Sequence, residues 1–211
     1  MKRTRVLLAD HHSVLTDCLT HLLRPEFEVV GVACDGTAMV EMAKQHKPDV
    51  IVADTSLPQL NGIDAARIVR KMLRSTKILF LTMHSDHFLV AEAFRAGAQG
   101  FVLKATSAQE FLNALRAVAR GETYITPALT GDVISALMTI GPRERHGDDP
   151  LTVRQRQLLQ LVAEGKTMKE AAALMDISTR TAESHKYEIM RRLGVETTAN
   201  LIRHALELKL V

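Results

Sequence analysis

Short apolar runs alternate with longer amphipathic segments over the first 125 residues. Around residues 14–22 and 63–69, apolar side chains recur three and four positions apart, which is the spacing of one helix face. The runs between such segments are short and uninterrupted, as in strands that are buried on both faces. They lie at residues 5–9, 28–33, 49–53, 77–82 and 100–104. Strands that alternate with helices predict an α/β fold, here a doubly wound, five-stranded parallel sheet with helices on both faces.

Residues 150–211 carry a helical pattern throughout. Thr152 with Gln155, and Thr167 with Glu170, have the spacing of capping boxes, which mark helix starts. Two more helices are expected over residues 179–193 and 198–208, which gives four in all. A short helix joined by a tight turn to a polar and basic one predicts a helix-turn-helix unit in an all-α domain.

Turn-forming and charged residues separate the two patterns. The stretch from Gly141 to Pro150 is polar and holds two glycines and two prolines, which is typical of a linker. A short apolar helix is expected just before it, over residues 129–138. The predicted parts are a sheet domain at residues 1–122, a linker with a short helix at residues 123–149, and the all-α domain at residues 150–211.

Reactive side chains follow four of the predicted strands. They are Asp10, Asp54, Thr82 and Lys104. Parallel sheets bind ligands beyond the carboxyl ends of their strands, so these four side chains are expected at one rim. The chemistry that fits is phosphoryl transfer to Asp54, which would act as the nucleophile. Lys104 and a Mg²⁺ ion would balance the charge of the phosphoryl oxygens.

Three stretches resemble the receiver domain of bacterial two-component response regulators. They are ADTSLPQLNG at 53–62, LTMHSD at 81–86 and GFVLKA at 100–105. The resemblance covers residues 4–122. It implies a flavodoxin-like fold, phosphorylation of Asp54 by a sensor histidine kinase, and a magnesium ion as cofactor.

The resemblance also assigns roles to single residues. Thr82 matches the switch hydroxyl, Phe101 the switch aromatic residue, and Lys104 the invariant lysine of the family. Pro58 and Gly62 match the Asp-x-x-x-Pro-x-x-x-Gly loop. The candidate residues of the acidic metal site are Asp10, Asp54 and Ser56.

The chain departs from the family at the acidic pair after the first strand. His11 follows Asp10, where the family usually has a second acid that ligates magnesium directly. A neutral imidazole is a poorer ligand for a hard cation, and a protonated one would repel it. His11 therefore predicts weakened magnesium binding and slow or absent phosphorylation. The alternative is that Asp10, Asp54 and water suffice.

Several histidines are expected near the same rim. They are His11, His12, His84 and His87. Imidazole suits zinc, copper or nickel. However, His12 and His84 occur at matching positions in ordinary members of the subfamily, and the spacing is not a recognised zinc pattern. The sequence therefore disfavours a transition-metal site.

The helix expected over residues 179–193 has two different sides. Ala182, His185, Ile189 and Leu193 recur three or four apart and are expected to face the core. The other side is polar and basic, a composition suited to phosphate contact and to reading base edges. A solvated helix surface is the alternative, and a glutamate on this side favours it because a carboxylate repels phosphates.

Residues 151–195 resemble the helix-turn-helix domain of the LuxR/FixJ/NarL group, which implies double-stranded DNA as partner. By family position, Lys169 and Thr181 touch phosphates. The residues expected to face the major groove are Glu183, Ser184 and Tyr187. Further candidates on the same side are Arg180, Lys186 and Arg191. Ala171 and Ala182 stand where the group usually has isoleucine and valine, which shrinks the expected core.

Composition adds little to this picture. Residues 150–211 hold ten Lys and Arg against seven Asp and Glu, a formal charge of +3, which favours an anionic partner. Cys18 and Cys34 form no framework, so buried reduced thiols are expected. The longest apolar runs are too short for a membrane span or a signal peptide, so a cytoplasmic protein with no membrane partner is expected.

The favoured interpretation is a two-domain, DNA-binding transcriptional response regulator that is not an enzyme. The resemblance implies that phosphorylation frees a dimeric, DNA-binding form, with RNA polymerase as a possible further partner. A second hypothesis is a phosphorylation-independent regulator that uses the receiver for dimerisation or docking. A third is an aspartyl-phosphate phosphatase, but that class needs a general acid where this chain has Ser56.

Overall fold

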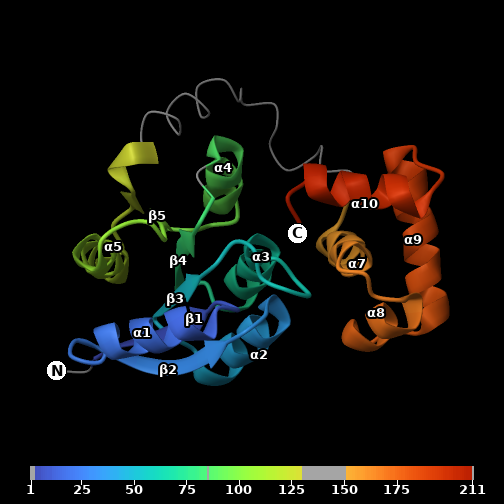
Figure 1. Cartoon of the computed structure of the whole chain (residues 1–211). Coiled ribbons are helices and arrows are strands. Elements are labelled where there is room, and N and C mark those ends of the chain that lie inside the picture. Colours follow the sequence, from blue (N-terminus) through green and yellow to red (C-terminus); the bar gives the residue numbers. More distant parts are fainter. Residues whose placement is uncertain (1–2, 85, 130–150, 211) are drawn as a thin grey trace. The chain divides into compact units, whose positions relative to one another are not determined.

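The computed structural model describes residues 3–84, 86–129 and 151–210. The chain divides into two compact units, the first made mainly of residues before 130 and the second mainly of residues after 150. The N-terminal unit is an α/β domain and the C-terminal unit is a group of helices (Figure 1). The predicted fold class is confirmed for both units.

A parallel sheet forms the centre of the N-terminal unit. Its strands are β1 (Thr4–Ala9), β2 (Phe27–Ala33), β3 (Val50–Ala53), β4 (Lys77–Thr82), β5 (Gly100–Leu103) and β6 (Tyr124–Ile125). Their order is β2-β1-β3-β4-β5-β6, and each pair of neighbours is parallel. The order reverses between β1 and β3, so the carboxyl ends of these two strands form a topological switch point, where ligands bind in such sheets.

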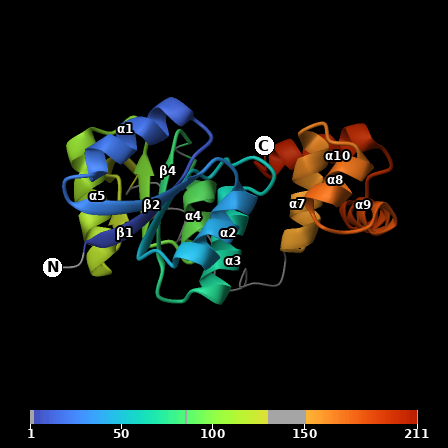
Figure 2. The ribbon, with the colours of Figure 1, turned by 90° about the horizontal axis from the view of Figure 1, so that it is seen from below.

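Helices cover both faces of the sheet. They are α1 (Ser13–Leu23), α2 (Gly36–His46), α3 (Gly62–Met72), α4 (His87–Arg95) and α5 (Ala108–Arg120). Helices α1 and α5 lie on one face, and α2, α3 and α4 lie on the other (Figure 2). Leu23 of α1 and Leu115 of α5 are fully buried in one cluster with Val6 and Val102 of the strands. The continuous apolar runs of the sequence are thus strands covered on both faces.

The sheet contains one short strand more than the sequence predicted. The Tyr124 amide donates to the Gln99 carbonyl at 3.0 Å, and β6 pairs with β5. The sheet therefore has six strands rather than five, and residues 124–125 belong to it rather than to a linker. A strand of two residues is too short to show a strand pattern in the sequence.

The predicted linker and its short helix lie mostly outside the described residues. Within the described part, Pro127–Leu129 forms a 3₁₀ turn, and Leu129 is buried. The predicted helix over residues 129–138 otherwise falls in residues 130–150, and the domain boundary placed there stays a prediction.

Four helices make up the described part of the C-terminal unit, as predicted. They are α7 (Val153–Ala163), α8 (Met168–Leu174), α9 (Thr179–Leu193) and α10 (Thr198–Glu207). Their core holds Leu158, Ala171, Ala182, Ile189 and Leu201, all at most 1% exposed. Helices α8 and α9 are joined by residues 175–178 and form the helix-turn-helix.

The helix ends follow local signals in the sequence. Both capping boxes are present, at Thr152 with Gln155 and at Thr167 with Glu170. The Ser178 hydroxyl caps the start of α9 by accepting from an amide in its first turn. These caps satisfy amides that have no partner inside the helix, so the boundaries of α7, α8 and α9 are set locally.

Two expectations based on composition have different outcomes. In the described part of the chain, none of the helices has both the length and the apolar character that a membrane span requires. Cys18 and Cys34 are both exposed and free, so the expectation of buried thiols is wrong. Cys18 fits the helical spacing of α1, but it lies beyond the stripe that faces the sheet, and so does Val14, which is 76% exposed.

Candidate functional site

The ends of β1 and β3 place two carboxylates next to each other. Ala9 pairs with Ala53 at the end of the β1–β3 ladder, and Asp10 and Asp54 are the next residues. The ladder continues by one bond, because the Asp54 amide donates to the Ala9 carbonyl at 2.8 Å. Asp10 is 6% exposed and Asp54 is 4% exposed. Backbone pairing therefore holds two buried carboxylates at the switch point of the sheet.

The ammonium group of Lys104 lies between these carboxylates. Its Nζ is 2.6 Å from Oδ2 of Asp10 and 2.6 Å from Oδ2 of Asp54. Lys104 follows β5, and its amide donates to the Thr82 carbonyl at 2.7 Å, so the sheet also fixes this residue. One cation faces two anions, which leaves one negative charge unbalanced among these three side chains. Buried charge of this kind favours the binding of a cation.

The pKa of the Asp10 carboxyl is lowered below its ordinary value of 3.8. Burial raises this pKa, but hydrogen bonds from Lys104 and from the amide and ring of His12, together with the charge of Lys104, outweigh burial. The His12 amide and the His12 Nδ1 atom each lie 2.9 Å from Oδ1 of Asp10. Asp10 is therefore an ionised, accepting carboxylate at neutral pH.

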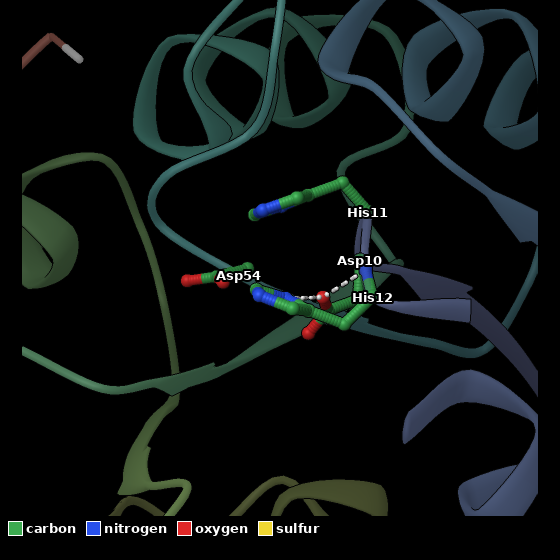
Figure 3. A group of neighbouring side chains, drawn as sticks. All are labelled: Asp10, His11, His12 and Asp54. Carbon is green, nitrogen blue, oxygen red and sulfur yellow. Dashed lines mark hydrogen bonds and ion pairs between the residues drawn. The ribbon is translucent and has the colours of Figure 1, made fainter. Parts of the chain in front are cut away.

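His11 and His12 lie beside the two carboxylates (Figure 3). Because an ionised carboxylate only accepts hydrogen bonds, His12 Nδ1 carries the hydrogen in its contact with Asp10. The centroids of the two imidazole rings are 3.9 Å apart and the ring planes are tilted by 42°. Both rings are exposed at the mouth of the site, and both carboxylates are buried beneath them.

Thr82 and Phe101 lie on the neighbouring strands β4 and β5. The Thr82 side chain is fully buried, and its Oγ1 lies 2.8 Å from Oγ1 of Thr55. Phe101 is also fully buried, and its ring centroid is 6.4 Å from that of Phe80. The partner Thr55 was missed in the sequence. The register that places β3 beside β4 is the signal that identifies it, since Thr55 lies two residues beyond β3.

The loop after Asp54 is held close to its backbone. The Ser56 amide donates to Oδ1 of Asp54 at 3.3 Å, and the Gly62 amide donates to the Thr55 carbonyl at 2.8 Å. A Cβ atom at Gly62 would lie 1.9 Å from the Asp54 carbonyl oxygen. Only glycine allows this close approach, so Gly62 positions the main chain at Asp54.

The side chains at this site fit a divalent cation. Asp10 and Asp54 offer oxygen ligands, which magnesium prefers, and magnesium commonly keeps several waters in proteins. His11 adds imidazole nitrogen, which suits zinc, copper and nickel better. The two carboxylates are thus sufficient to hold Mg²⁺. The imidazole nitrogen beside them makes the site less selective for this ion.

The predicted DNA-binding residues lie at the start of α8 and along α9. Helix α9 buries Ala182 and Ile189, and its other side faces away from the core of its unit. Tyr187 on this side is 73% exposed, which is unusual for an aromatic side chain without a partner surface. The exposed members of the predicted set are Lys169, Arg180, Thr181, Glu183, Ser184, Tyr187 and Arg191.

Lys186 is the member of this set that is partly buried. Its ammonium group donates to the Thr198 hydroxyl at 2.8 Å, which ties it to the start of α10. The Thr181 hydroxyl lies 2.8 Å from that of the cap residue Ser178, so Thr181 is held at the first turn of α9. His185 and Leu193, expected on the core side, are both partly buried.

The chain combines a sheet that carries two carboxylates and a lysine with an exposed helix-turn-helix. This combination defines a class of signalling regulators. Residues 6–116 match the response regulator receiver domain, and residues 149–205 match the bacterial regulatory proteins of the luxR family. The chain belongs to the response regulators of the NarL/FixJ type and is a DNA-binding transcription regulator.

Similar proteins share this organisation over nearly their whole length. The transcriptional regulatory protein MctR of Rhizobium johnstonii is 37% identical over 207 residues, which cover 97% of this chain and 94% of MctR. The oxygen regulatory protein NreC of Staphylococcus carnosus is 33% identical over 214 residues, which cover 98% and 99% of the two chains. Among solved structures, the RcsB response regulator of Salmonella typhimurium matches with a TM-score of 0.63 and 25% identity, over 98% of both chains.

Proposed function

We propose that Asp54 is the phosphoacceptor through which a sensor histidine kinase controls this regulator. The observation that carries the proposal is the 2.6 Å contact between Lys104 Nζ and Asp54 at the switch point of the sheet. A lysine at this place neutralises charge on a phosphoryl group as it arrives. The 4% exposure of Asp54 keeps water from competing with the incoming group.

The proposed step is an in-line phosphoryl transfer. An Asp54 carboxylate oxygen forms a bond to phosphorus as the bond from phosphorus to the leaving nitrogen breaks, and that nitrogen keeps the electron pair. Asp10 and Asp54 would hold Mg²⁺ next to the Ser56 main chain, and the ion would supply positive charge to the phosphoryl oxygens. The Thr82 hydroxyl, now partnered by Thr55, would turn to donate to the acyl phosphate.

The response that follows is DNA binding. Phosphorylation would shift the population towards a dimeric form whose two α9 helices read half-sites about one helical turn apart. Lys169 and Thr181 would contact phosphates, and Glu183, Ser184 and Tyr187 would face base edges. The dimer would act in the cytoplasm, where bacterial DNA lies, and would recruit or exclude RNA polymerase.

A second candidate function is regulation without phosphorylation. His11 favours it, because this imidazole replaces the second acid of the magnesium site. In that case the receiver would serve dimerisation or docking, and Asp54 would have a structural role.

Intact mass measured after incubation with a small phosphodonor distinguishes the two functions. With phosphoramidate and a series of Mg²⁺ concentrations, the full chain should gain roughly 80 Da, the mass of a phosphoryl group. Asp54→Asn should abolish the gain, and Asp17→Asn, at an exposed position of α1, should keep it. Equal labelling of the Asp54→Asn variant, or none of the wild type at any magnesium concentration, would exclude Asp54 as the phosphoacceptor.

A further inference from the structure

Four side chains with metal-ligating atoms meet at the mouth of the receiver site. They are Asp10, His11, His12 and Asp54, and one ligand atom of each lies within 4.8 Å of those of the other three (Figure 3). Ligands of a tetrahedral zinc ion are about 3.4 Å apart, given bonds of roughly 2.0–2.2 Å. The cluster is thus near the size of a metal site.

The hydrogen bond of His12 prepares its ring for ligation. Nδ1 of His12 lies 2.9 Å from Oδ1 of Asp10, so a metal ion could replace the hydrogen between these two atoms and bind both of them. The same contact fixes the ring beside that of His11, with centroids 3.9 Å apart.

The charge of the cluster also favours a cation. Asp10 and Asp54 bring two negative charges, and Lys104 supplies one positive charge between their Oδ2 atoms. A divalent ion bound through the other carboxylate oxygens and the imidazoles would balance the remaining charge. The donor set of two imidazoles and two carboxylates is softer than the oxygen set that magnesium prefers.

We propose that Asp10, His11, His12 and Asp54 form a binding site for Zn²⁺ or a similar divalent transition-metal ion in place of Mg²⁺. The sequence alone disfavoured such a site because the spacing matches no zinc motif. The structure adds that one ligand atom of each of these four residues lies within 4.8 Å of those of the other three. As a regulatory consequence, which rests on the proposed function, a metal ion bound to Asp54 would block phosphorylation.

Metal titration of the full chain tests the site directly. The experiment uses a Cys18→Ser, Cys34→Ser background, so that the two exposed thiols do not bind the metal. Calorimetry with Zn²⁺ and the visible absorption of Co²⁺ should both report one site per chain with nitrogen and oxygen ligands. Circular dichroism confirms that each variant is folded.

The variant His11→Asp is the decisive comparison. It restores the oxygen donor usual in the family, so it should weaken Zn²⁺ and Co²⁺ binding about tenfold or more and tighten Mg²⁺ binding. His21→Gln, at an exposed histidine in the last turn of α1, should leave all three affinities unchanged. Equal Zn²⁺ affinity of the His11→Asp and His21→Gln variants, or no Zn²⁺ binding by the wild type, would overturn the proposal.

Phosphorylation with Mg²⁺ alone keeps this inference separate from the proposed function. If zinc binds and Asp54 gains no phosphoryl group at any magnesium concentration, the metal site stands and the proposed function fails. If Asp54 is phosphorylated and zinc does not bind, the proposed function stands and the metal site fails.

Discussion

The interaction of Lys104 with Asp10 and Asp54 determines the energetics of the receiver site at the scale of single residues. A lysine that contacts two buried carboxylates at 2.6 Å offsets their cost of burial and their mutual repulsion. Removal of the lysine should therefore cost more stability than removal of either carboxylate.

Substitution of Lys104 by methionine should lower the free energy of unfolding by about 3 kcal/mol, because it leaves two buried carboxylates without a cation. Adding Asp54→Asn to this variant should recover part of the loss by removing one charge. Urea unfolding of the single and double variants measures both effects, with Lys44→Met at an exposed position of α2 as control. If Lys104→Met were as stable as the control, the balance of charges described here would be wrong.

Acid should destabilise the receiver through Asp10. Its pKa is lowered in the folded chain from 3.8, so this carboxylate stabilises the fold above its unfolded pKa. That stabilisation is lost as the pH falls below 3.8 and through the folded pKa. Urea unfolding of the wild type and Asp10→Asn should therefore differ most above about pH 5 and converge towards pH 3. A difference that stays constant over this range would contradict the lowered pKa.

At the scale of elements, the loop between β3 and α3 fixes the main chain of Asp54. A methyl group at Gly62 would meet the Asp54 carbonyl at 1.9 Å, and backbone cannot move aside as a side chain can.

The variant Gly62→Ala should lose about 1–3 kcal/mol of stability and should be labelled more slowly by phosphoramidate. Gly31→Ala is the matched control, because its new methyl group would meet the flexible end of Met42 rather than main chain. Thermal unfolding and intact mass measure the two effects. Equal losses in both variants would remove the special role of Gly62.

Helices α8 and α9 should contribute to DNA binding in two separable ways. Replacing Lys169 or Arg180 by alanine should weaken binding to all DNA sequences and reduce the salt dependence of affinity by about one unit of slope each. Replacing Ser184 or Tyr187 should instead relax the choice of sequence.

Fluorescence anisotropy over a salt series, with a selected site and with unrelated DNA, separates these effects. Arg203→Ala on α10, exposed beside Glu207, is the control and should change neither quantity. An unchanged salt slope in the Lys169 and Arg180 variants would mean that these two residues do not contact phosphates.

Most elements could be predicted because their signals are local. Apolar periodicity located the strands and helices of both units, and the Thr152 and Thr167 capping boxes located two helix starts. The strand β6 gave no such signal, because two residues cannot show a period. The exposure of Cys18 was also missed, since helical spacing does not show how wide the buried stripe is.

The receiver site could be predicted in part. Asp10, Asp54 and Lys104 were recognisable because each follows a strand, and parallel strands share one rim. The contact of Thr55 with Thr82 and that of His12 with Asp10 depend on register and ring orientation, which one sequence does not specify. A transition-metal site at this rim was disfavoured from the sequence, because the spacing of the histidines matches no zinc motif.

At the scale of the whole molecule, a phosphoryl group on one unit is proposed to control DNA binding by the other. Phosphorylation can strengthen DNA binding only if the phosphorylated chain populates a DNA-binding state more than the unphosphorylated chain does. The response should therefore require Asp54 and leave the intrinsic fold of the helix-turn-helix unchanged.

The most direct test is footprinting of the full chain on sites selected from random-sequence DNA. The measurement is made with and without phosphoramidate, across a salt series, for the wild type and Asp54→Asn. We expect the phosphodonor to strengthen the footprint of the wild type about tenfold or more and to leave that of Asp54→Asn unchanged, at salt where non-specific binding is lost. Equal footprints for both chains, with and without phosphodonor, would contradict control through Asp54.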